Sequence, residues 1–516
     1  MFRIELKDKG IPNTFAVTNP KSYLSEKSIE RRQKQGIPVD STDFPINPLY
    51  LEQIKATGAS IKTTSKWVET VTVYLPDSSA VSALKNLSFV DTLYCVWKGD
   101  LPQADLLKSG QNKFPEYESD DFLKRSMNIY GDGYEQISML NGDLLHEAGF
   151  RGKDMSIAVI DVGFKNCDQI AAFNFEQIKE VKNFTHKPED PLRGSDTHGT
   201  AVLSSMLANW PGIMVGTAPE ADYYLFKTEV DGEEFPVEED YWVAAMEYAD
   251  STGIDVVNTS LGYSVFDDPS MNHTYEQLDG HTILASRAAS MAGNKGMLIF
   301  NSAGNEGRKS WGKITVPSDA DNIITVGAVK LDSIIADFSS RGPSADGRVK
   351  PDLCAVGQSS ALINANGVVY RSDGTSFSSP ILTGAGACLW QALPHKSSKE
   401  IIALMRNAGD RNTNPDFTYG YGIPDLGKIY AENATGNFKI SKENKLLFFD
   451  INENYLYLNN DSNTKFDLQI FNSMGQLIVQ YKDITTPVDL NALSQGIYIA
   501  RVRQGEKQAV QKFTKW

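Results

Sequence analysis

Residues 156–161 are Ser156-Ile157-Ala158-Val159-Ile160-Asp161, a short apolar run that ends in a carboxylate. Two further runs of this kind lie at residues 254–258 and 296–301, and helical stretches separate them. Strands that are apolar on both faces are typical of a parallel sheet covered by helices on its two sides. The sequence therefore predicts a doubly wound, mostly parallel α/β domain over residues 129–432, with its functional site at the C-terminal ends of the strands.

Different patterns flank this domain. Residues 1–100 combine alternating strands, such as the one expected at residues 68–75, with a short helix, which indicates a small α+β unit. Residues 101–128 are polar and irregular, so we expect an exposed, cleavable linker there. Residues 437–516 contain short strands separated by turn signals, which favours an antiparallel β-sandwich.

The composition excludes several classes of protein. The 516 residues are 41% hydrophobic and 22% charged, values that are ordinary for a soluble globular chain and exclude a fibre or general disorder. The net charge of −15 argues against a nucleic-acid binder, because such proteins usually present a basic face. No apolar run reaches the roughly 18 residues that a membrane-spanning helix needs.

The cysteines and the first six residues indicate less about the class of protein than the composition does. Four cysteines are too few for a disulfide scaffold at this length, and the absence of CxxC and HExxH patterns leaves a zinc site without support. We expect Cys95, Cys167, Cys354 and Cys388 to be buried apolar thiols, with one disulfide left open. Residues 1–6 lack the features of a signal peptide, which leaves open a cytoplasmic protein or a chain whose signal has been removed.

Three short segments of the predicted α/β domain carry the residue types of a nucleophilic hydrolase. Asp161 ends the first apolar run, His198 opens a helical stretch at 196–200, and Ser376 begins another at 373–380. A serine hydroxyl becomes a useful nucleophile when a base removes its proton, and the imidazole base needs an orienting carboxylate. Each segment is weak evidence alone, but together and in this order they predict a catalytic triad.

The start of the Ser376 helix and a fourth segment extend this hypothesis. A helix N-terminus offers unpaired N–H groups where negative charge develops, and we expect Pro380 to fall within the first turn, where its missing N–H matters little. Asn305 follows a predicted strand and supplies a neutral amide donor. Asn305 and the Ser376 N–H are therefore predicted to hold the oxyanion of a tetrahedral intermediate.

These segments resemble those of the subtilisin-like serine proteases, which share the order Asp, His, Ser. Further matching stretches run along the whole domain, at residues 216–221, 257–262, 324–329, 338–343 and 350–353. The resemblance implies a serine endopeptidase that acts through an acyl-enzyme intermediate and needs no cofactor. It also implies two walls of a substrate cleft, one formed by Ser260, Leu261 and Gly262 and the other by Ala303, Gly304 and Asn305.

The chain departs from the family pattern at Val162, where the family usually has serine or threonine. A hydroxyl at that position can support the catalytic carboxylate, so its loss bears on the rate more than on the identity of the enzyme.

A metal site has little support in the sequence. Residues 266–280 carry four acidic residues in an expected loop, and many subtilisin-like enzymes hold structural calcium in oxygen-rich loops. No EF-hand spacing is present, and acidic loops are usually just solvated. A structural Ca²⁺ therefore stays open, and no residue is assigned as a metal ligand.

The flanking units have resemblances of their own. Residues 1–100 resemble, in layout and position, the N-terminal prodomain that assists folding of such proteases and then blocks their cleft. Residues 437–516 resemble the sorting domain of the Bacteroidetes type IX secretion system, on the evidence of residues 468–477, 488–498 and 512–516. The resemblance implies a secreted or cell-surface protein without its signal peptide, with protein or peptide substrates and the secretion machinery as partners.

A protein of another class also fits the fold. A catalytically weak surface protein that binds peptides or glycans would keep the α/β domain and lose the constellation of Asp161, His198, Asn305 and Ser376. Because all four residues are present, we favour the endopeptidase.

Overall fold

The computed structural model describes residues 1–10, 19–77, 79–99 and 129–434, together with 449–452, 455–458, 465–472, 476–485, 488–494, 496–504 and 507–515. The linker predicted at 101–128 lies outside the described residues, and so does the stretch 435–448. By its contacts the chain divides into two compact units. One unit contains the N-terminal sheet and the central domain, and the other contains the C-terminal strands.

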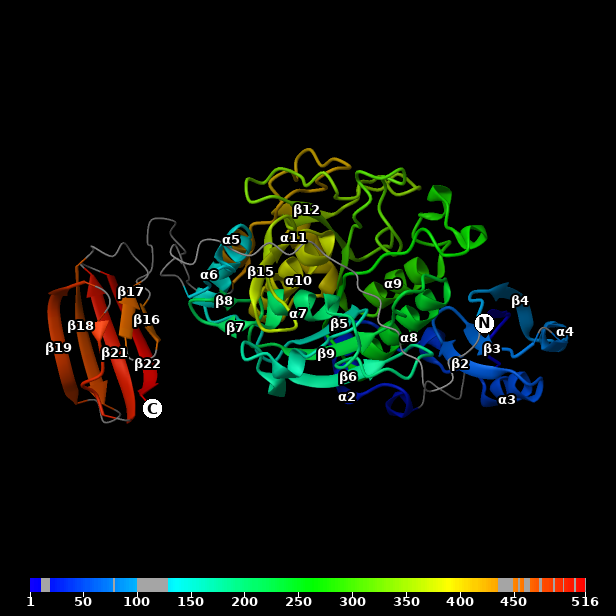
Figure 1. Ribbon diagram of the computed structural model, residues 1–516, viewed down its shortest axis with the longest axis horizontal. Helices are drawn as coiled ribbons and strands as arrows, with labels where there is room; N and C mark the ends of the chain where they lie inside the picture. The colour runs from blue at the N-terminus through cyan, green and yellow to red at the C-terminus, as the bar shows by residue number, and fades with distance from the viewer. Residues whose placement is uncertain are drawn as a thin grey trace. The chain divides into compact units, whose positions relative to one another are not determined.

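A seven-stranded sheet forms the centre of the first unit (Figure 1). Its order is β13-β12-β11-β10-β5-β9-β6, and every neighbouring pair is parallel. The strands are β5 (Ser156–Asp161), β6 (Ile178–Asn183), β9 (Asp222–Lys227), β10 (Val256–Thr259), β11 (Leu298–Ser302), β12 (Ile324–Val329) and β13 (Leu353–Val356). Later strands are added on both sides of β5, so the switch point at which such sheets bind ligands lies beside this strand.

Helices cover the sheet because its strands are apolar on both faces. β5, β11 and β12 are buried along their whole length. Helix α10 (Thr375–Ala392) packs on β10 to β13, and α7 (His198–Leu207) packs on α10 and β5. Helices α8 (Val237–Thr252) and α9 (Leu284–Asn294) pack on each other, α8 on β5 and α9 on β11. This arrangement confirms the doubly wound α/β prediction.

Smaller elements complete the central domain. The helices are α5 (Tyr134–Ser138), α6 (Gly142–Glu147), α11 (Ser398–Asn407) and α12 (Leu426–Asn433). The short strands β7 (Asn209–Trp210) and β8 (Met214–Val215) form one pair, and β14 (Ser360–Ile363) and β15 (Val369–Ser372) form another.

The N-terminal residues form an antiparallel sheet with the order β2-β3-β1-β4. Its strands are β1 (Phe2–Leu6), β2 (Ser60–Ser65), β3 (Thr70–Tyr74) and β4 (Val90–Cys95), and its helices are α2 (Glu26–Lys34), α3 (Pro48–Ala56) and α4 (Ser79–Lys85). The sheet has a core of its own, in which Ile4, Ile54, Val71 and Leu84 are fully buried. The strand expected at residues 68–75 corresponds to β3.

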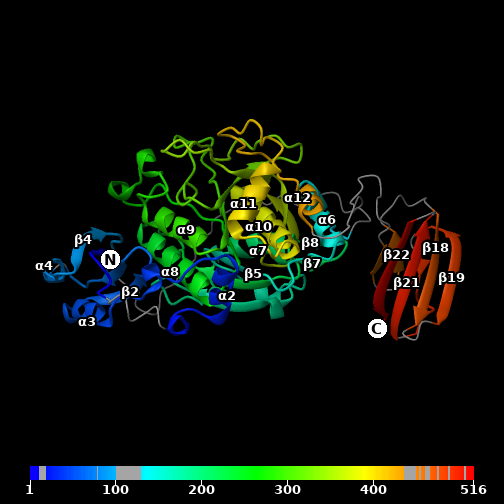
Figure 2. The ribbon, with the colours of Figure 1, turned by 180° about the vertical axis from the view of Figure 1, so that it is seen from behind.

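The N-terminal sheet and α2 contact helix α8 (Figure 2), and charged side chains form ion pairs between them. Arg3 in β1 donates to both carboxylate oxygens of Asp240, at 2.8 and 2.7 Å. In α2, Arg31 and Arg32 donate to opposite oxygens of Asp250, near the end of α8. All three side chains of this Arg31–Arg32–Asp250 cluster are buried, so the ions are held by one another and not by water.

The second unit contains the C-terminal antiparallel strands. One sheet has the order β19-β18-β21-β22 and another β16-β17-β20, and all their pairs are antiparallel. The strands are β16 (Phe449–Asn452), β17 (Tyr455–Leu458), β18 (Phe466–Asn472), β19 (Leu477–Ile484), β20 (Val488–Asp489), β21 (Gly496–Gln504) and β22 (Lys507–Lys515). Phe466, Leu468, Val488 and Val502 share one buried cluster, so strands of both sheets contribute to a single core.

The described residues contain no disulfide and no helix that could span a membrane. All four cysteines are free thiols, of which Cys167, Cys354 and Cys388 are buried. Burial raises the pKa of Cys167 to about 12, so this thiol stays protonated at neutral pH. Within the described parts of the chain, every helix is too short or too polar to cross a bilayer.

Candidate active site

Asp161 and His198 meet at the carboxyl edge of the central sheet. Asp161 is the last residue of β5 and is fully buried, and His198 is the first residue of α7. His198 Nδ1 lies 2.7 Å from Asp161 Oδ1, which also accepts from the Val162 N–H at 2.9 Å. With its Nδ1–H donated to the carboxylate, the imidazole has Nε2 as the nitrogen that can take up a proton.

Val162 gives the second carboxylate oxygen of Asp161 no hydrogen-bond donor. Asp161 Oδ2 is buried and has no hydrogen-bond partner among the described residues. Because the valine side chain offers no donor, the carboxylate is satisfied on one oxygen only. A buried acceptor without a donor costs about 1–3 kcal/mol.

The ionisation of His198 reflects two opposing influences. Burial lowers its pKa, but the charge and hydrogen bond of Asp161, with a smaller contribution from Asp196, outweigh that effect and raise the pKa above its ordinary 6.5. The imidazolium form that arises when a base accepts a proton is therefore stabilised in this site.

Ser376 is the second residue of α10 and contacts Ser260, the residue that follows β10. Its hydroxyl donates to the Ser260 carbonyl at 3.4 Å, and the Ser260 hydroxyl donates to the Ser376 carbonyl at 2.9 Å. Pro380 is the sixth residue of α10 and lies inside the helix, not in the first turn as expected. In a regular helix the N–H of residue 380 would bond to the carbonyl of residue 376, and because proline has none, Ser260 supplies a donor.

Asn305 is held by the residue before the serine. Its Oδ1 accepts from the Thr375 N–H at 2.9 Å and from Thr375 Oγ1 at 3.0 Å. Thr375 Oγ1 in turn accepts from the Gly304 N–H at 3.2 Å. These bonds fix the orientation of the amide, so that Nδ2 is the end left to donate elsewhere.

The segments predicted to line the cleft follow two neighbouring strands. Ser260, Leu261 and Gly262 come directly after β10, and Ala303 and Gly304 directly after β11. A Cβ added to Gly262 would lie 2.0 Å from Thr315 Oγ1, so only glycine fits there. The structure thus brings all the predicted site residues to the carboxyl edge of the sheet.

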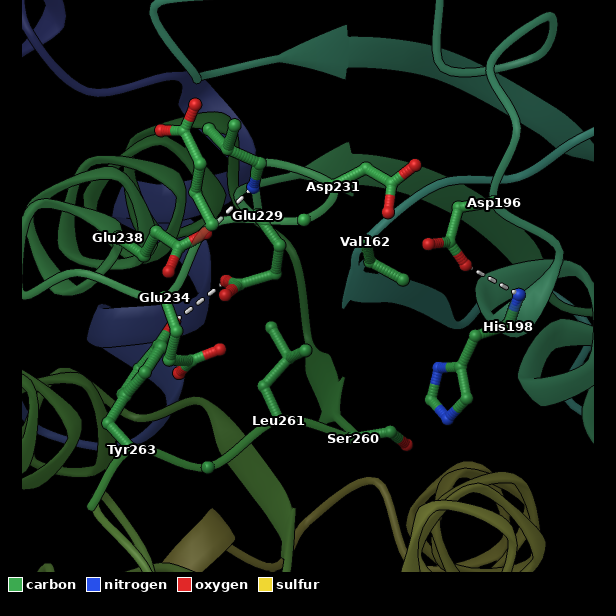
Figure 3. Close-up of a pocket in the computed structure, with 14 residues that line it drawn as sticks. Val162, Asp196, His198, Glu229, Asp231, Glu234, Glu238, Ser260, Leu261 and Tyr263 are labelled. Atoms are coloured by element: carbon green, nitrogen blue, oxygen red, sulfur yellow. Dashed lines mark hydrogen bonds between the residues drawn. The ribbon is translucent and has the colours of Figure 1, made fainter. Parts of the chain in front are cut away.

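A cavity of about 250 Å³ adjoins His198 (Figure 3). Figure 3 shows His198 and Ser260 at one end, Leu261 in the middle, and Glu229, Glu234 and Glu238 gathered at the other end. Six of the lining residues are acidic, namely Asp196, Glu229, Asp231, Glu233, Glu234 and Glu238. Sequence reasoning missed these residues, although five of them lie in the acidic stretch between residues 229 and 238.

Acidic side chains of the loop considered for calcium make contacts within the protein. Asp268 pairs with Lys98 at 2.5 Å, and Asp279 accepts from the N–H groups of His281 and Thr282. Within the described residues, no three His, Cys, Asp or Glu side chains are grouped as metal ligands.

Family models match all three parts of the chain. Residues 152–422 match the model of the Subtilase family, residues 1–111 that of the peptidase S8 propeptide domain of Bacteroidota, and residues 452–515 that of a secretion system C-terminal sorting domain. Subtilisin-like protease SBT6.1 of Arabidopsis thaliana is 28% identical over 327 residues, which are 60% of this chain and 29% of that protein. Subtilisin E of Bacillus subtilis is 27% identical over 290 residues, 56% of this chain and 68% of that protein.

A solved structure shares the fold. The epidermin leader peptide processing serine protease (EpiP) of Staphylococcus aureus superposes with a TM-score of 0.54 at 18% identity, covering 85% of this chain and 99% of that one. The chain spans only between a quarter and three tenths of the longer curated relatives, such as SBT6.1 and the human membrane-bound transcription factor site-1 protease. The matched family model covers more than half of the chain and the whole edge that carries Asp161, His198 and Ser376. The chain belongs to the subtilase family.

Proposed function

We propose that this chain is a secreted or cell-surface serine endopeptidase in which Asp161, His198 and Ser376 form the triad and Asn305 is an oxyanion donor. The observation that supports it most directly is the 2.7 Å contact between His198 Nδ1 and Asp161 Oδ1 in a buried setting. The His198 ring also lies 5.9 Å from that of Phe377, the residue after Ser376, and an imidazole oriented by a carboxylate is the base that activates a serine hydroxyl.

The first half of the proposed reaction forms the acyl-enzyme. Ser376 Oγ adds to the peptide carbonyl carbon while its proton passes to His198 Nε2, and Asp161 stabilises the imidazolium. The oxyanion accepts from Asn305 Nδ2 and the Ser376 N–H. The C–N bond then breaks, and His198 returns the proton to the departing amine.

The second half releases the product. Water adds to the acyl carbon as His198 takes up its proton, and collapse of the second intermediate breaks the bond to Ser376 Oγ. The serine recovers its proton from His198, so the cycle closes without a cofactor. Ser260 to Gly262 and Ala303 to Gly304 are proposed to hold the substrate backbone between them.

A fluorophosphonate probe tests this proposal, because it labels only an activated serine. We expect labelling of the wild-type chain and none of Ser376→Ala, and a loss of about 10⁴-fold or more in peptide hydrolysis for Ser376→Ala or His198→Ala. Asn305→Ala should lower kcat by roughly 10²- to 10³-fold, the cost of removing such a donor in a subtilisin. Turnover by Ser376→Ala within tenfold of wild type would exclude the triad.

We further propose that the N-terminal domain restrains the enzyme. Trp97 Nε1 donates to Glu233 at 2.8 Å, and Glu233 lines the cavity beside His198, so the end of this domain reaches the rim of the site. Cleavage between residues 101 and 128 should therefore raise activity. Equal rates for the intact and the cleaved chain would show that the domain is only an appendage.

The C-terminal strands are proposed to serve delivery by the type IX machinery. They form a unit with a core of their own, and every proposed catalytic residue lies in the other unit. Deletion of residues 437–516 should leave hydrolysis intact and prevent arrival at the surface of the native host. Normal export of the shortened chain would exclude the sorting role, and an inactive soluble form would show that the units depend on each other.

A further inference from the structure

The acidic cavity beside His198 contains more carboxyl side chains than the catalytic residues account for. Its lining includes six carboxylates and neither lysine nor arginine among the described residues. One wall is the Ser260 to Gly262 segment that is proposed to hold the substrate backbone. Side chains of an extended peptide project every 3.3 Å or so to alternate sides, so a peptide on this wall places a side chain into the cavity.

Four of the six carboxylates are used in contacts within the protein. Asp196 accepts from the His198 N–H, and Asp231 accepts from Ser195 Oγ. The other two, Glu233 and Glu238, accept respectively from Lys187 and Trp97, and from the N–H groups of Val230 and Phe235. These four side chains are positioned by local structure and shape the cavity.

Glu229 and Glu234 are different. The Glu229 side chain is only 8% exposed, and both of its bonds, from Thr228 Oγ1 at 2.7 Å and Tyr263 OH at 2.8 Å, fall on Oε1. None of the described residues donates to Glu229 Oε2, although this carboxylate lines the cavity. The half-buried Glu234 carboxylate likewise receives no hydrogen bond from the described residues.

A positively charged group would stabilise the ionised forms of Glu229 and Glu234. Burial, with a smaller contribution from the charge of Asp161, raises the pKa of Glu229 to about 7 against the hydrogen bonds from Thr228 and Tyr263. Burial, and then the charges of the neighbouring acids, raise the pKa of Glu234 to about 8. Burial and the charges of Glu229 and Glu234 also raise the pKa of Glu238 well above its usual range. Like charges that are buried together are costly to ionise, and a positive group placed between them removes that cost.

A peptide side chain fits this requirement better than a metal ion does. The described carboxylates are not grouped as metal ligands. A lysine or arginine on a long aliphatic stem can instead pack along the half-buried Leu261 and bring its charged end to the glutamates. Figure 3 shows Leu261 lying between His198 and the glutamates.

We propose that Glu229 and Glu234 form a subsite for a lysine or arginine side chain, so that the enzyme selects peptides with a basic residue close to the cleaved bond. This inference rests on the proposed endopeptidase function. It assigns Glu229 and Glu234 to selection of the substrate and leaves the chemical steps to the triad.

The test uses internally quenched peptides and the full chain, before and after limited proteolysis between residues 101 and 128. One position at a time, up to four residues on either side of the cleaved bond, carries lysine, norleucine or glutamate. Norleucine matches the length of lysine without its charge. At one position we expect lysine to raise kcat/KM over norleucine by roughly tenfold or more, and glutamate to lower it.

Variants then connect the preference to the two glutamates. Glu229→Gln and Glu234→Gln should each reduce the lysine-to-norleucine ratio, and the double variant should nearly abolish it. Glu234→Lys should reverse the preference toward glutamate, which keeps the proposal falsifiable if a neutral variant is unstable. Glu276→Gln is the matched control, because Glu276 is exposed and lies outside the cavity.

The outcomes separate this inference from the proposed function. If the wild-type chain is labelled by the fluorophosphonate probe and cleaves peptides without preferring lysine, the subsite is refuted and the endopeptidase stands. A lysine preference that survives in the double variant and in Glu234→Lys also refutes the subsite. If Ser376 is not labelled and no peptide is cleaved, the proposed function fails and the subsite fails with it.

Discussion

Ser260 and Ser376 hydrogen-bond to each other in both directions, the Ser260 hydroxyl to the Ser376 carbonyl at 2.9 Å and the Ser376 hydroxyl to the Ser260 carbonyl at 3.4 Å. Ser260 is itself oriented by Asn258 Nδ2 at 3.0 Å, and Asn258 Oδ1 accepts from Ser379 and Thr383 in α10. Because Ser260 also begins a wall of the proposed cleft, one network positions both the proposed substrate-binding segment and the proposed nucleophile.

Ser260→Ala should lower kcat more than it changes KM. The hydroxyl makes two hydrogen bonds worth about 1 kcal/mol each, so we expect a loss of roughly five- to tenfold from a less well placed Ser376. The rate of labelling by the fluorophosphonate probe should decline by a similar factor. Ser264→Ala, four residues further along, is the control and should change neither rate. A rise in KM alone would contradict the positioning role.

Pro380→Ala should maintain or raise the stability of the protein while lowering its activity. The new N–H can bond to the Ser376 carbonyl and compete with Ser260, while a helix interior favours alanine over proline by about 3 kcal/mol. We expect an equal or higher Tm and a several-fold lower kcat. Pro236→Ala at the start of α8, where proline is tolerated, should leave kcat unchanged. A Pro380→Ala enzyme with full activity would show that the Ser260 bond does not depend on the proline.

Val162→Thr should raise both the stability of the folded protein and kcat. Threonine has nearly the shape of valine and offers a hydroxyl to the buried Asp161 Oδ2, which has no donor among the described residues. One satisfied acceptor is worth about 1 kcal/mol in the free energy of unfolding, and a better oriented carboxylate should raise kcat. Val162→Ala provides the comparison, since it removes the methyl groups without adding a donor. Losses in Tm and kcat similar to those of the alanine variant would show that the oxygen is satisfied in another way.

The preference for lysine should grow with pH between about 6 and 9, because Glu229 and Glu234, with pKa values of about 7 and 8, lose their protons in this range. The ratio of kcat/KM for the lysine and norleucine peptides isolates this effect, since both peptides depend equally on His198. In Glu234→Gln the increase should be smaller and should end at lower pH. A ratio that is constant with pH would show that the carboxylates are ionised throughout.

The same pair should lower stability as pH rises. Between their ordinary pKa of 4.5 and the raised values, the folded state keeps protons that the unfolded state has released. The free energy of unfolding therefore decreases with rising pH through this window, and Glu234→Gln should flatten the decrease. Chemical denaturation of both forms from pH 5 to pH 9 measures it.

Asp250→Asn should loosen the N-terminal domain after cleavage of the linker. Asp250 is the shared partner of Arg31 and Arg32, and removing one member of a buried charge cluster typically costs about 3–5 kcal/mol. We expect the cleaved N-terminal fragment to separate from the Asp250→Asn protein by size-exclusion chromatography and to stay bound to the wild type. Glu26→Gln, which removes an exposed ion pair on the same helix, should behave as wild type. If the N-terminal fragment stays bound in both variants, contacts of the β1–β4 sheet hold it and the Arg31–Arg32–Asp250 cluster does not.

Much of this site follows from local sequence. Asp161, His198 and Ser376 are recognisable because each stands where a strand ends or a helix begins, and parallel strands bring those points to one edge. The layered sheet is also predictable, since strands buried on both faces are near-continuous apolar runs in the sequence.

Other parts depend on contacts that no local pattern records. Thr375 holds Asn305 from 70 residues away in the sequence. Asn258, which orients the nearby Ser260, is itself bound by Ser379 from 121 residues away. Pro380 was expected in the first turn, but α10 begins at Thr375, so Pro380 is its sixth residue and falls in the second turn. The raised pKa values of Glu229 and Glu234 arise from burial, which residue identity alone does not give.

The contact between Trp97 and Glu233 has an evolutionary consequence. The segment from Glu229 to Glu238 lines the proposed subsite and also receives the end of the N-terminal domain. A substitution there that changes the proposed substrate preference would also alter the contact through which the N-terminal domain is proposed to restrain the enzyme. Under these two proposals, specificity and activation would evolve together, and a change in one would select for compensating substitutions near Trp97.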